Sequence, residues 1–287
     1  MKQLDALHLI QQLRRQDHAH KGHAGKVLLI GGAPSMAGAL VLAGQSALYS
    51  GAGWVQLMML DEYSAHLVPT QPELMVHKAH QWAPIKALAD IQPDVVAIGP
   101  GLGTDETALL WLEAVLSWDG SLVLDADALN LLAMNRGLLT VLKQRTAPSC
   151  ITPHPGEAAR LLGCSSQDVQ SDREAHLHAL MALTHSVVVL KGHHTLTGAA
   201  HHDSLVYLAG NPGMAVSGMG DVLTGCVAAM AAQGVHHQLD MWQSTCLAVQ
   251  LHSLAGDQLL SNGIGPVGMT ASELAMQIRT VINAQLH

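Results

Sequence analysis

The feature that most constrains this chain is a long stretch without charge between Lys26 and Asp61. It is longer than a membrane-spanning helix requires, but glycine and proline interrupt it at Gly31, Gly32, Pro34, Gly38, Gly44, Gly51 and Gly53. The uninterrupted pieces predict a strand at 27–30, a helix of small residues at 37–50 and a second strand at 54–60. A strand, turn, helix and strand covered on both faces account for the missing charges without lipid.

The same alternation of short apolar runs and helical segments continues along the chain. Further strands are predicted at 95–98, 122–124 and 187–190, and further helices at 105–118, 128–134 and 168–185. Strands separated by helices in this way are typical of a mostly parallel sheet in an α/β domain. After Lys191, two short runs at 195–197 and 204–208 flank a polar turn and predict an antiparallel edge to that sheet.

The C-terminal third completes the expected organisation. Three helices are predicted near 221–233, 240–260 and 270–284. No linker, repeat or low-complexity tract divides the chain, so residues 1–287 are expected to form a single domain.

Composition excludes several classes of protein. The 14 Lys and Arg residues against 22 Asp and Glu residues give a net charge of −8, which argues against nucleic-acid or anionic-membrane binding. An apolar content of 49% with only 13% charged residues rules out disorder. The four cysteines form no CxxC pair and the 19 histidines include no HExxH, so a zinc site is not expected. The first residues lack a signal-peptide pattern, and a cytoplasmic location is predicted.

Generic nucleotide-binding motifs are missing, but one glycine-rich stretch stands out. The chain has no GxxxxGK[ST], and the GxG at Gly101 and Gly103 lacks a third glycine. In residues 210–225, a turn with Gly218 and Gly220 runs directly into an apolar helix. Free backbone N–H groups at such a helix start make an anion site, and we assign this anion hole to Gly218, Met219 and Gly220.

Asp221 lies beside this anion site and has two interpretations. As an N-cap it would stabilise the helix by about 1 kcal/mol. Beside a bound phosphate, its carboxylate would instead serve as a general base. The sequence of the stretch alone does not separate the two.

Three further motifs follow predicted strands. They are DADALN at 125–130, TPHPGE at 152–157 and LKGHHT at 190–195. In open α/β sheets, ligands bind at the carboxyl edge of the strands, where such motifs converge. Lys191 is therefore either an ordinary residue at a strand end or a contact to a nucleotide, and the Pro155 turn is either structural or part of a site.

These motifs, in this order, resemble the ADP-dependent NAD(P)H-hydrate dehydratase family. The resemblance also includes KGHAGK at 21–26, Gly31, Gly32 and GPGLG at 99–103, and it extends over nearly the whole chain. It implies a ribokinase-like three-layer α/β/α fold. It also implies repair of hydrated NADH or NADPH: ADP phosphorylates the C6 hydroxyl of the S-epimer, and phosphate leaves to restore the ring, with AMP as the second product.

The resemblance assigns roles residue by residue. Contacts to the hydrated dinucleotide are expected from Ala39, Gly103, His154 and Asp221, and Asp221 is the expected catalytic residue. Contacts to the adenine nucleotide are expected from Lys191, Gly192, His193, His194, Thr195 and Gly220. Kinases of this fold often carry Asn-x-x-Glu after a proline. Here His154 replaces the asparagine and Glu157 keeps the acid, which predicts a contact to Mg²⁺ through water.

The resemblance also implies partners, and two other functions compete with it. A homotetramer that works with a separate NAD(P)H-hydrate epimerase is expected, because this length leaves no room for the epimerase domain to which many bacterial dehydratases are fused. One competing function is a sugar or vitamin-precursor kinase of the same fold, which would release a stable phosphorylated product. The other is a nucleotide-binding protein without turnover, and an intact Asp221 argues against it.

Overall fold

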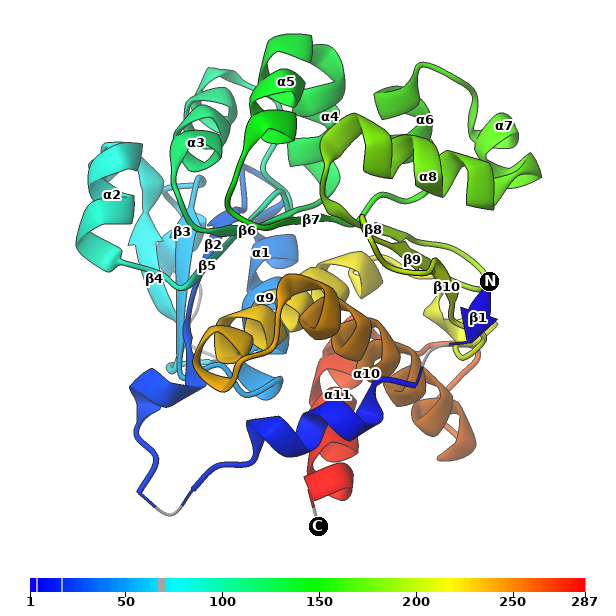
Figure 1. Ribbon diagram of the computed structural model, residues 1–287. Helices are drawn as coiled ribbons and strands as arrows, with labels where there is room; N and C mark the ends of the chain where they lie inside the picture. The colour runs from blue at the N-terminus through cyan, green and yellow to red at the C-terminus, as the bar shows by residue number, and fades with distance from the viewer. Residues whose placement is uncertain (4, 17, 67–70, 287) are drawn as a thin grey trace.

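The fold is built on one mixed sheet between two layers of helices (Figure 1). The computed structural model describes residues 1–3, 5–16, 18–66 and 71–286. Within them the strand order is β1-β10-β9-β8-β7-β6-β5-β2-β3-β4. The strands are β1 (Lys2–Gln3), β2 (Lys26–Gly31), β3 (Trp54–Met59), β4 (Met75–Lys78), β5 (Val95–Ile98), β6 (Ser121–Leu124), β7 (Ser149–Ile151), β8 (Val187–Leu190), β9 (Leu196–Gly198) and β10 (Leu205–Val206).

Most of the sheet is parallel, as the sequence predicted. Seven neighbouring strands, in the order β4-β3-β2-β5-β6-β7-β8, pair in parallel. Strand β9 is antiparallel to both β8 and β10, which confirms the predicted antiparallel edge. Strand β1 adds to β10 in parallel and was not predicted.

Helices cover both faces of the sheet. One layer holds α1 (Ala37–Tyr49), α9 (Met219–His237), α10 (Met241–Ser261) and α11 (Ala271–Leu286). The other holds α2 (Pro84–Ile91), α3 (Glu106–Ser117), α4 (Ala126–Met134), α5 (Arg136–Gln144), α6 (Pro155–Leu162), α7 (Ser166–Ser171) and α8 (Arg173–Thr184). Short 3₁₀ turns lie at Leu7–Leu13, Lys21–Ala24, Ser64–His66, Ala79–Gln81 and Pro212–Met214.

The central strands are buried on both faces, which explains the long uncharged stretch. In β2, Val27 and Leu29 pack against the layer of α1, α9, α10 and α11. The alternate residues Leu28 and Ile30 pack into the opposite layer with α3 and α4. Because successive strand side chains point to opposite faces, a strand in the middle layer has no solvent-facing position for a charge. The expected three-layer α/β/α architecture is confirmed.

Several predicted boundaries were wrong. The helix predicted at 168–185 is two helices, α7 and α8, because Asp172 leaves helical geometry and its side chain accepts the N–H of Ala175 as a cap. Helix α9 begins at Met219 rather than near residue 221. Strand β4 and helices α2 and α5 were not predicted, and the strand expected before TPHPGE, which is β7, was predicted without bounds. No helix among the described residues is long and apolar enough to cross a membrane.

The parallel order brings the sequence motifs to one edge. Strands β5, β6, β7 and β8 are neighbours and run the same way. Their carboxyl ends therefore present the GPGLG, DADALN, TPHPGE and LKGHHT segments side by side. Helix α9 packs under β5 and β6 and adds its N-terminus to this edge.

Candidate active site

A buried ion pair joins two of the strand ends. Asp125 follows β6 and is 1% exposed, and Lys191 follows β8. The Lys191 Nζ donates to Asp125 Oδ1 at 2.6 Å, while Thr224 Oγ1 of α9 donates to Asp125 Oδ2 at 2.7 Å. Both carboxylate oxygens of Asp125 are therefore occupied, and one network ties two strands to α9.

Glu157 extends this network through the start of α6. Its Oε2 accepts the backbone N–H of His154 at 2.7 Å and lies 3.8 Å from Lys191 Nζ. Burial, opposed in part by Lys191, raises the pKa of Glu157 to about 7. Burial also opposes the charge on Lys191, but the carboxylates of Asp125 and Glu157 hold the pKa of Lys191 above its usual value. The lysine therefore stays charged among several acids.

His154 is the N-cap of α6, and its ring is fixed by that role. Its Nδ1 accepts the N–H of Gly156 at 2.9 Å, and Nε2 lies 3.2 Å from Glu157 Oε1. These contacts place the proton of the neutral ring on Nε2. Burial and the charge of Lys191 lower the pKa of His154, so the ring is neutral at physiological pH.

The start of α9 lies directly against Lys191. Gly218 is the N-cap, with a φ of 91° that favours glycine, and the first intrahelical bond runs from Val222 N to Gly218 O. Ahead of it, the N–H groups of Met219, Gly220 and Asp221 have no intrahelical acceptor. A Cβ added to Gly220 would lie 3.2 Å from Lys191 Nζ. Gly220, one residue of the predicted anion hole, therefore lies close to the lysine ammonium.

Asp221 is the third residue of α9 and is half-buried. Gly218 occupies the N-cap position, so the alternative that Asp221 caps the helix is wrong. Among the described residues, no side chain or backbone group makes a hydrogen bond or ion pair with its carboxylate. Burial, together with the charge of Asp125, raises the pKa of Asp221 to about 7. A carboxyl group with this pKa exchanges protons readily at neutral pH.

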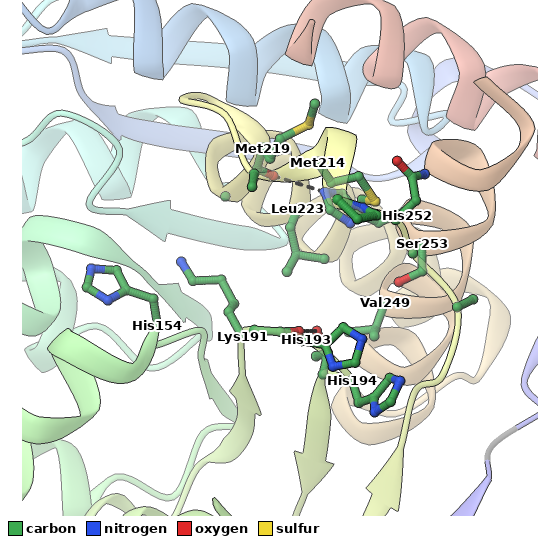
Figure 2. A pocket seen from close by; sticks show the side chains of 18 of the residues that line it. His154, Lys191, His193, His194, Met214, Met219, Leu223, Val249, His252 and Ser253 are labelled. Atoms are coloured by element: carbon green, nitrogen blue, oxygen red, sulfur yellow. Dashed lines mark hydrogen bonds between the residues drawn. The ribbon is translucent and has the colours of Figure 1, made fainter. Parts of the chain in front are cut away.

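A cavity of about 810 Å³ opens beside this cluster. All six predicted nucleotide contacts line it: Lys191, Gly192, His193, His194, Thr195 and Gly220. His154 and the anion-hole residue Met219 also line it. Its apolar wall includes Met214, Leu223 and Val249, and Figure 2 shows Lys191 reaching from the end of β8 between His154 and this wall.

The other three predicted substrate contacts, Ala39, Gly103 and Asp221, lie outside the cavity lining. Gly103 donates its backbone N–H to Asp127 Oδ2 at 2.9 Å, so it adjoins the acids that follow β6. Its segment packs on the turn before α1, where Ala33 N donates to Gly101 O at 2.6 Å. Ala39 is half-buried in the first turn of α1. A dinucleotide that contacts all four predicted residues would extend from the cavity past Asp221 towards α1.

Two residues at the site were missed by the sequence analysis. Thr224 supplies the second bond to Asp125. His252 of α10 is buried and donates from Nε2 to the Met219 carbonyl at 2.9 Å, and burial lowers its pKa to about 4 (Figure 2). Both sit inside apolar helices, where no local pattern marks a polar residue as functional.

The described residues include no cluster that would hold a metal ion through protein ligands alone. No group of three or more His, Cys, Asp or Glu side chains among them could hold a metal ion. Both oxygens of Glu157 face His154, and both oxygens of Asp125 are occupied. A contact from Glu157 to Mg²⁺ through water stays a prediction.

The fold places the chain among ribokinase-like proteins. A solved ribokinase-like protein from Enterococcus faecalis superposes with a TM-score of 0.82 over 99% of this chain and 96% of that one, at 28% identity. A hydroxyethylthiazole kinase from Pyrococcus horikoshii, at 14% identity and a TM-score of 0.61, shares the fold.

Sequence similarity assigns the chain to one family within this fold. The family model described as NAD(P)H-hydrate dehydratase matches residues 27–280, and the chain belongs to that family. The ADP-dependent (S)-NAD(P)H-hydrate dehydratase of Neisseria meningitidis is 37% identical over 94% of this chain and 88% of its own length. The Bacillus subtilis ADP/ATP-dependent NAD(P)H-hydrate dehydratase, co-crystallised with ATP/Mg²⁺, has a TM-score of 0.84 at 28% identity, over 100% of this chain and 99% of that one.

Other relatives are longer. The bifunctional NAD(P)H-hydrate repair enzyme of Escherichia coli is 39% identical over 95% of this chain, which covers 50% of that enzyme. The chain spans about half the length of several curated relatives that it matches.

Proposed function

We propose that this chain catalyses the ADP-dependent dehydration of the S-epimer of hydrated NADH or NADPH, with NADH or NADPH, AMP and phosphate as products. The observation that carries the proposal is the start of α9. There the Asp221 carboxylate has no bonded partner among the described residues, and burial beside Asp125 raises its pKa to about 7. It adjoins free N–H groups, and the preceding Gly220 lines a cavity of about 810 Å³. Membership of the family supports the choice of substrate, and the name of the Neisseria relative supports ADP as co-substrate.

The first step is phosphoryl transfer to the C6 hydroxyl of the hydrated ring. Asp221 takes the hydroxyl proton as a general base while the C6 oxygen bonds to the β-phosphorus of ADP. The bond from that phosphorus to the bridging oxygen breaks, and AMP leaves. Negative charge gathers on the transferred phosphoryl group, where the free N–H groups of α9 and the ammonium of Lys191 stabilise it.

The second step is elimination. Hydroxide is a poor leaving group and phosphate is a good one, so the phosphorylated C6 oxygen departs with the phosphate. A proton leaves C5 as the C6–O bond breaks, and the departing phosphate can accept it. The double bond between C5 and C6 returns, and no separate oxidant or reductant is needed.

Magnesium belongs to the proposal as a ligand of the nucleotide. When bound, Mg²⁺ would neutralise charge on the ADP phosphates. Glu157 is the residue proposed to contact it through water. The side chains of Asp221 and Lys191 are proposed to perform the proton transfer and the binding of the phosphoryl group.

An absorbance assay tests the proposed function. Hydrated NADH or NADPH is mixed with the protein, Mg²⁺ and either ADP or ATP, and recovery of the reduced-nicotinamide band is followed. The proposal expects ADP-dependent recovery with one AMP released per reduced cofactor. A stable phosphorylated product without recovery would instead identify a kinase, and ADP binding without AMP release would identify a binding protein.

We further propose the setting in which the reaction occurs. Residues 1–287 act as one dehydratase domain, assemble as a homotetramer and receive the S-epimer from a separate NAD(P)H-hydrate epimerase. Support for these points is the family resemblance. The cytoplasm is the proposed compartment, and the four free cysteines agree with a reducing environment. Light scattering measures the oligomer, and adding an epimerase to a mixture of epimers should raise total recovery.

A further inference from the structure

Arg173 holds the segment that follows β8, here called the nucleotide loop (residues 191–195). It is the first residue of α8. Its Nη1 donates to the carbonyls of His193 and His194, the latter at 2.9 Å. Its Nη2 donates to the carbonyls of Leu190 at 2.9 Å and Lys191 at 3.2 Å. The half-buried guanidinium therefore donates hydrogen bonds to four of the five carbonyl oxygens of residues 190–194.

These bonds fix where the N–H groups of the loop point. In a trans peptide, the carbonyl of one residue and the N–H of the next point in opposite directions. Carbonyls drawn to Arg173 therefore turn the N–H groups of Gly192, His194 and Thr195 away from it. Among the described residues none of these three N–H groups has a hydrogen-bond acceptor, and the same residues line the cavity.

The loop needs such external support because its backbone is unusual. Gly192 has a φ of 139° and His194 a φ of 58°. Side-chain-bearing residues rarely adopt the second value, at a cost of order 1 kcal/mol. A Cβ added to Gly192 would lie 3.1 Å from Arg173 Nη2, so the loop and the guanidinium are in close contact. Successive N–H groups held in this way form an anion-binding concavity.

We propose that Arg173 is a positioning residue for the nucleotide: it orients the N–H groups of the nucleotide loop towards the phosphates of ADP without touching ADP itself. The inference rests on the proposed function, which places ADP in the cavity. Arg173 does not line that cavity. Its effect should therefore appear in nucleotide affinity and not in the chemical step.

The chain supplies a matched control in Arg145. This second half-buried guanidinium also donates to four carbonyls, those of Val115, Leu116, Trp118 and Gly120. The Nε atoms of Arg145 and Arg173 are both buried and have no hydrogen-bond partner in the part of the chain that the structure describes. Burial lowers the pKa of both side chains. Arg145 and its partners lie outside the cavity lining. The two arginines thus differ mainly in which loop they hold.

The experiment compares Arg173→Met, Arg173→Lys and Arg145→Met with the wild type. Steady-state kinetics, ADP binding by calorimetry and the thermal midpoint are measured for each. We expect Arg173→Met to raise the KM and Kd for ADP about tenfold or more, as loss of charged hydrogen bonds does. Its kcat at saturating ADP should stay within about threefold of wild type. Arg173→Lys should recover part of the affinity, and Arg145→Met should lower the midpoint with ADP affinity unchanged.

Two results would overturn the proposal. One is an unchanged Kd for ADP in Arg173→Met, and the other is a loss of ADP affinity in Arg145→Met as large as that in Arg173→Met. If Arg173→Met does not fold, the Lys variant decides by the same two constants. If the wild-type protein binds ADP but restores no reduced cofactor, the proposed function is wrong. The role of Arg173 is still tested in that case, because it depends on the comparison of Kd values for ADP.

Discussion

The acids that follow β6 and Asp221 in the first turn of α9 lie close together but differ in how their carboxylates are bonded. Asp125 has both oxygens bonded, to Lys191 and to Thr224. Asp127 accepts from the Gly103 N–H at 2.9 Å and from Asn130 Nδ2 at 3.1 Å. Asp221, by contrast, has no bonded partner among the described residues, and burial beside Asp125 raises its pKa to about 7.

This difference in bonding suits the two kinds of carboxylate to different roles. A carboxylate with every oxygen bonded organises its neighbours and is costly to disturb. A carboxylate held without partners in a partly buried place has a perturbed pKa and is free to exchange a proton. The fully bonded carboxylates therefore follow a strand, and the carboxylate that we propose as the general base lies in the first turn of a helix.

Asp221→Asn is expected to have the largest effect, and it tests the role of the unbonded carboxylate. An amide cannot take the hydroxyl proton, so turnover should fall by about 10² to 10⁴, the usual range for loss of a general base. ADP binding and the thermal midpoint should stay near wild type, because no hydrogen bond or ion pair among the described residues involves this carboxylate. Steady-state rates, calorimetry and a melting curve provide the check. Retention of more than about a third of the wild-type rate would remove Asp221 from its role.

Asp125→Ala tests the other side of the comparison. The substitution leaves the buried Lys191 without its closest counter-ion and Thr224 without its acceptor. Breaking a buried ion pair from one side typically costs about 3–5 kcal/mol. Denaturant unfolding should show a loss of that size. A loss under about 1 kcal/mol combined with a collapse of the rate would mean that Asp125 acts in the chemistry.

The smallest expected effect on function is the loss of nucleotide affinity in Lys191→Ala, whose loss of stability should be similar to that of Asp125→Ala because the same ion pair is broken. Removing this ammonium from the cavity wall should weaken ADP binding by about 1.5–3 kcal/mol, the range for a charged hydrogen bond. The KM for the hydrated cofactor should change less. Lys86, in an exposed pair with Asp90, provides the control, and Lys86→Ala should change both affinity and stability by less than about 1 kcal/mol. Unchanged ADP dependence in Lys191→Ala would move the nucleotide elsewhere.

Much of the fold could be predicted because its central strands are apolar along their whole length. Strands β2, β5 and β8 stand out for that reason. Strand β7 has three residues, and β4 mixes polar with apolar residues at the edge of the sheet, so neither produces a distinct run. The break between α7 and α8 depends on one capping aspartate, Asp172, inside a continuous helical pattern.

The sequence motifs of the site could be predicted, but the hydrogen bonds that join them could not. The glycine-rich start of α9 and the acids after β6 mark their own positions. The bonds from Asp125 to Lys191 and Thr224 join residues 66 and 99 positions apart, so they exist only once the sheet has formed. Arg173 was missed for the same reason, because its partners belong to another element.

The pH dependence of kcat/KM for the hydrated cofactor, with ADP saturating, tests the central claim most directly. The general base works only when ionised, so the rate should rise with pH through a midpoint near the raised pKa of Asp221, about 7. Glu157 has a similar pKa, which makes Glu157→Gln the matched control. We predict that the rising limb persists in Glu157→Gln and disappears from the residual activity of Asp221→Asn. A limb that survives in Asp221→Asn and vanishes in Glu157→Gln would contradict this claim.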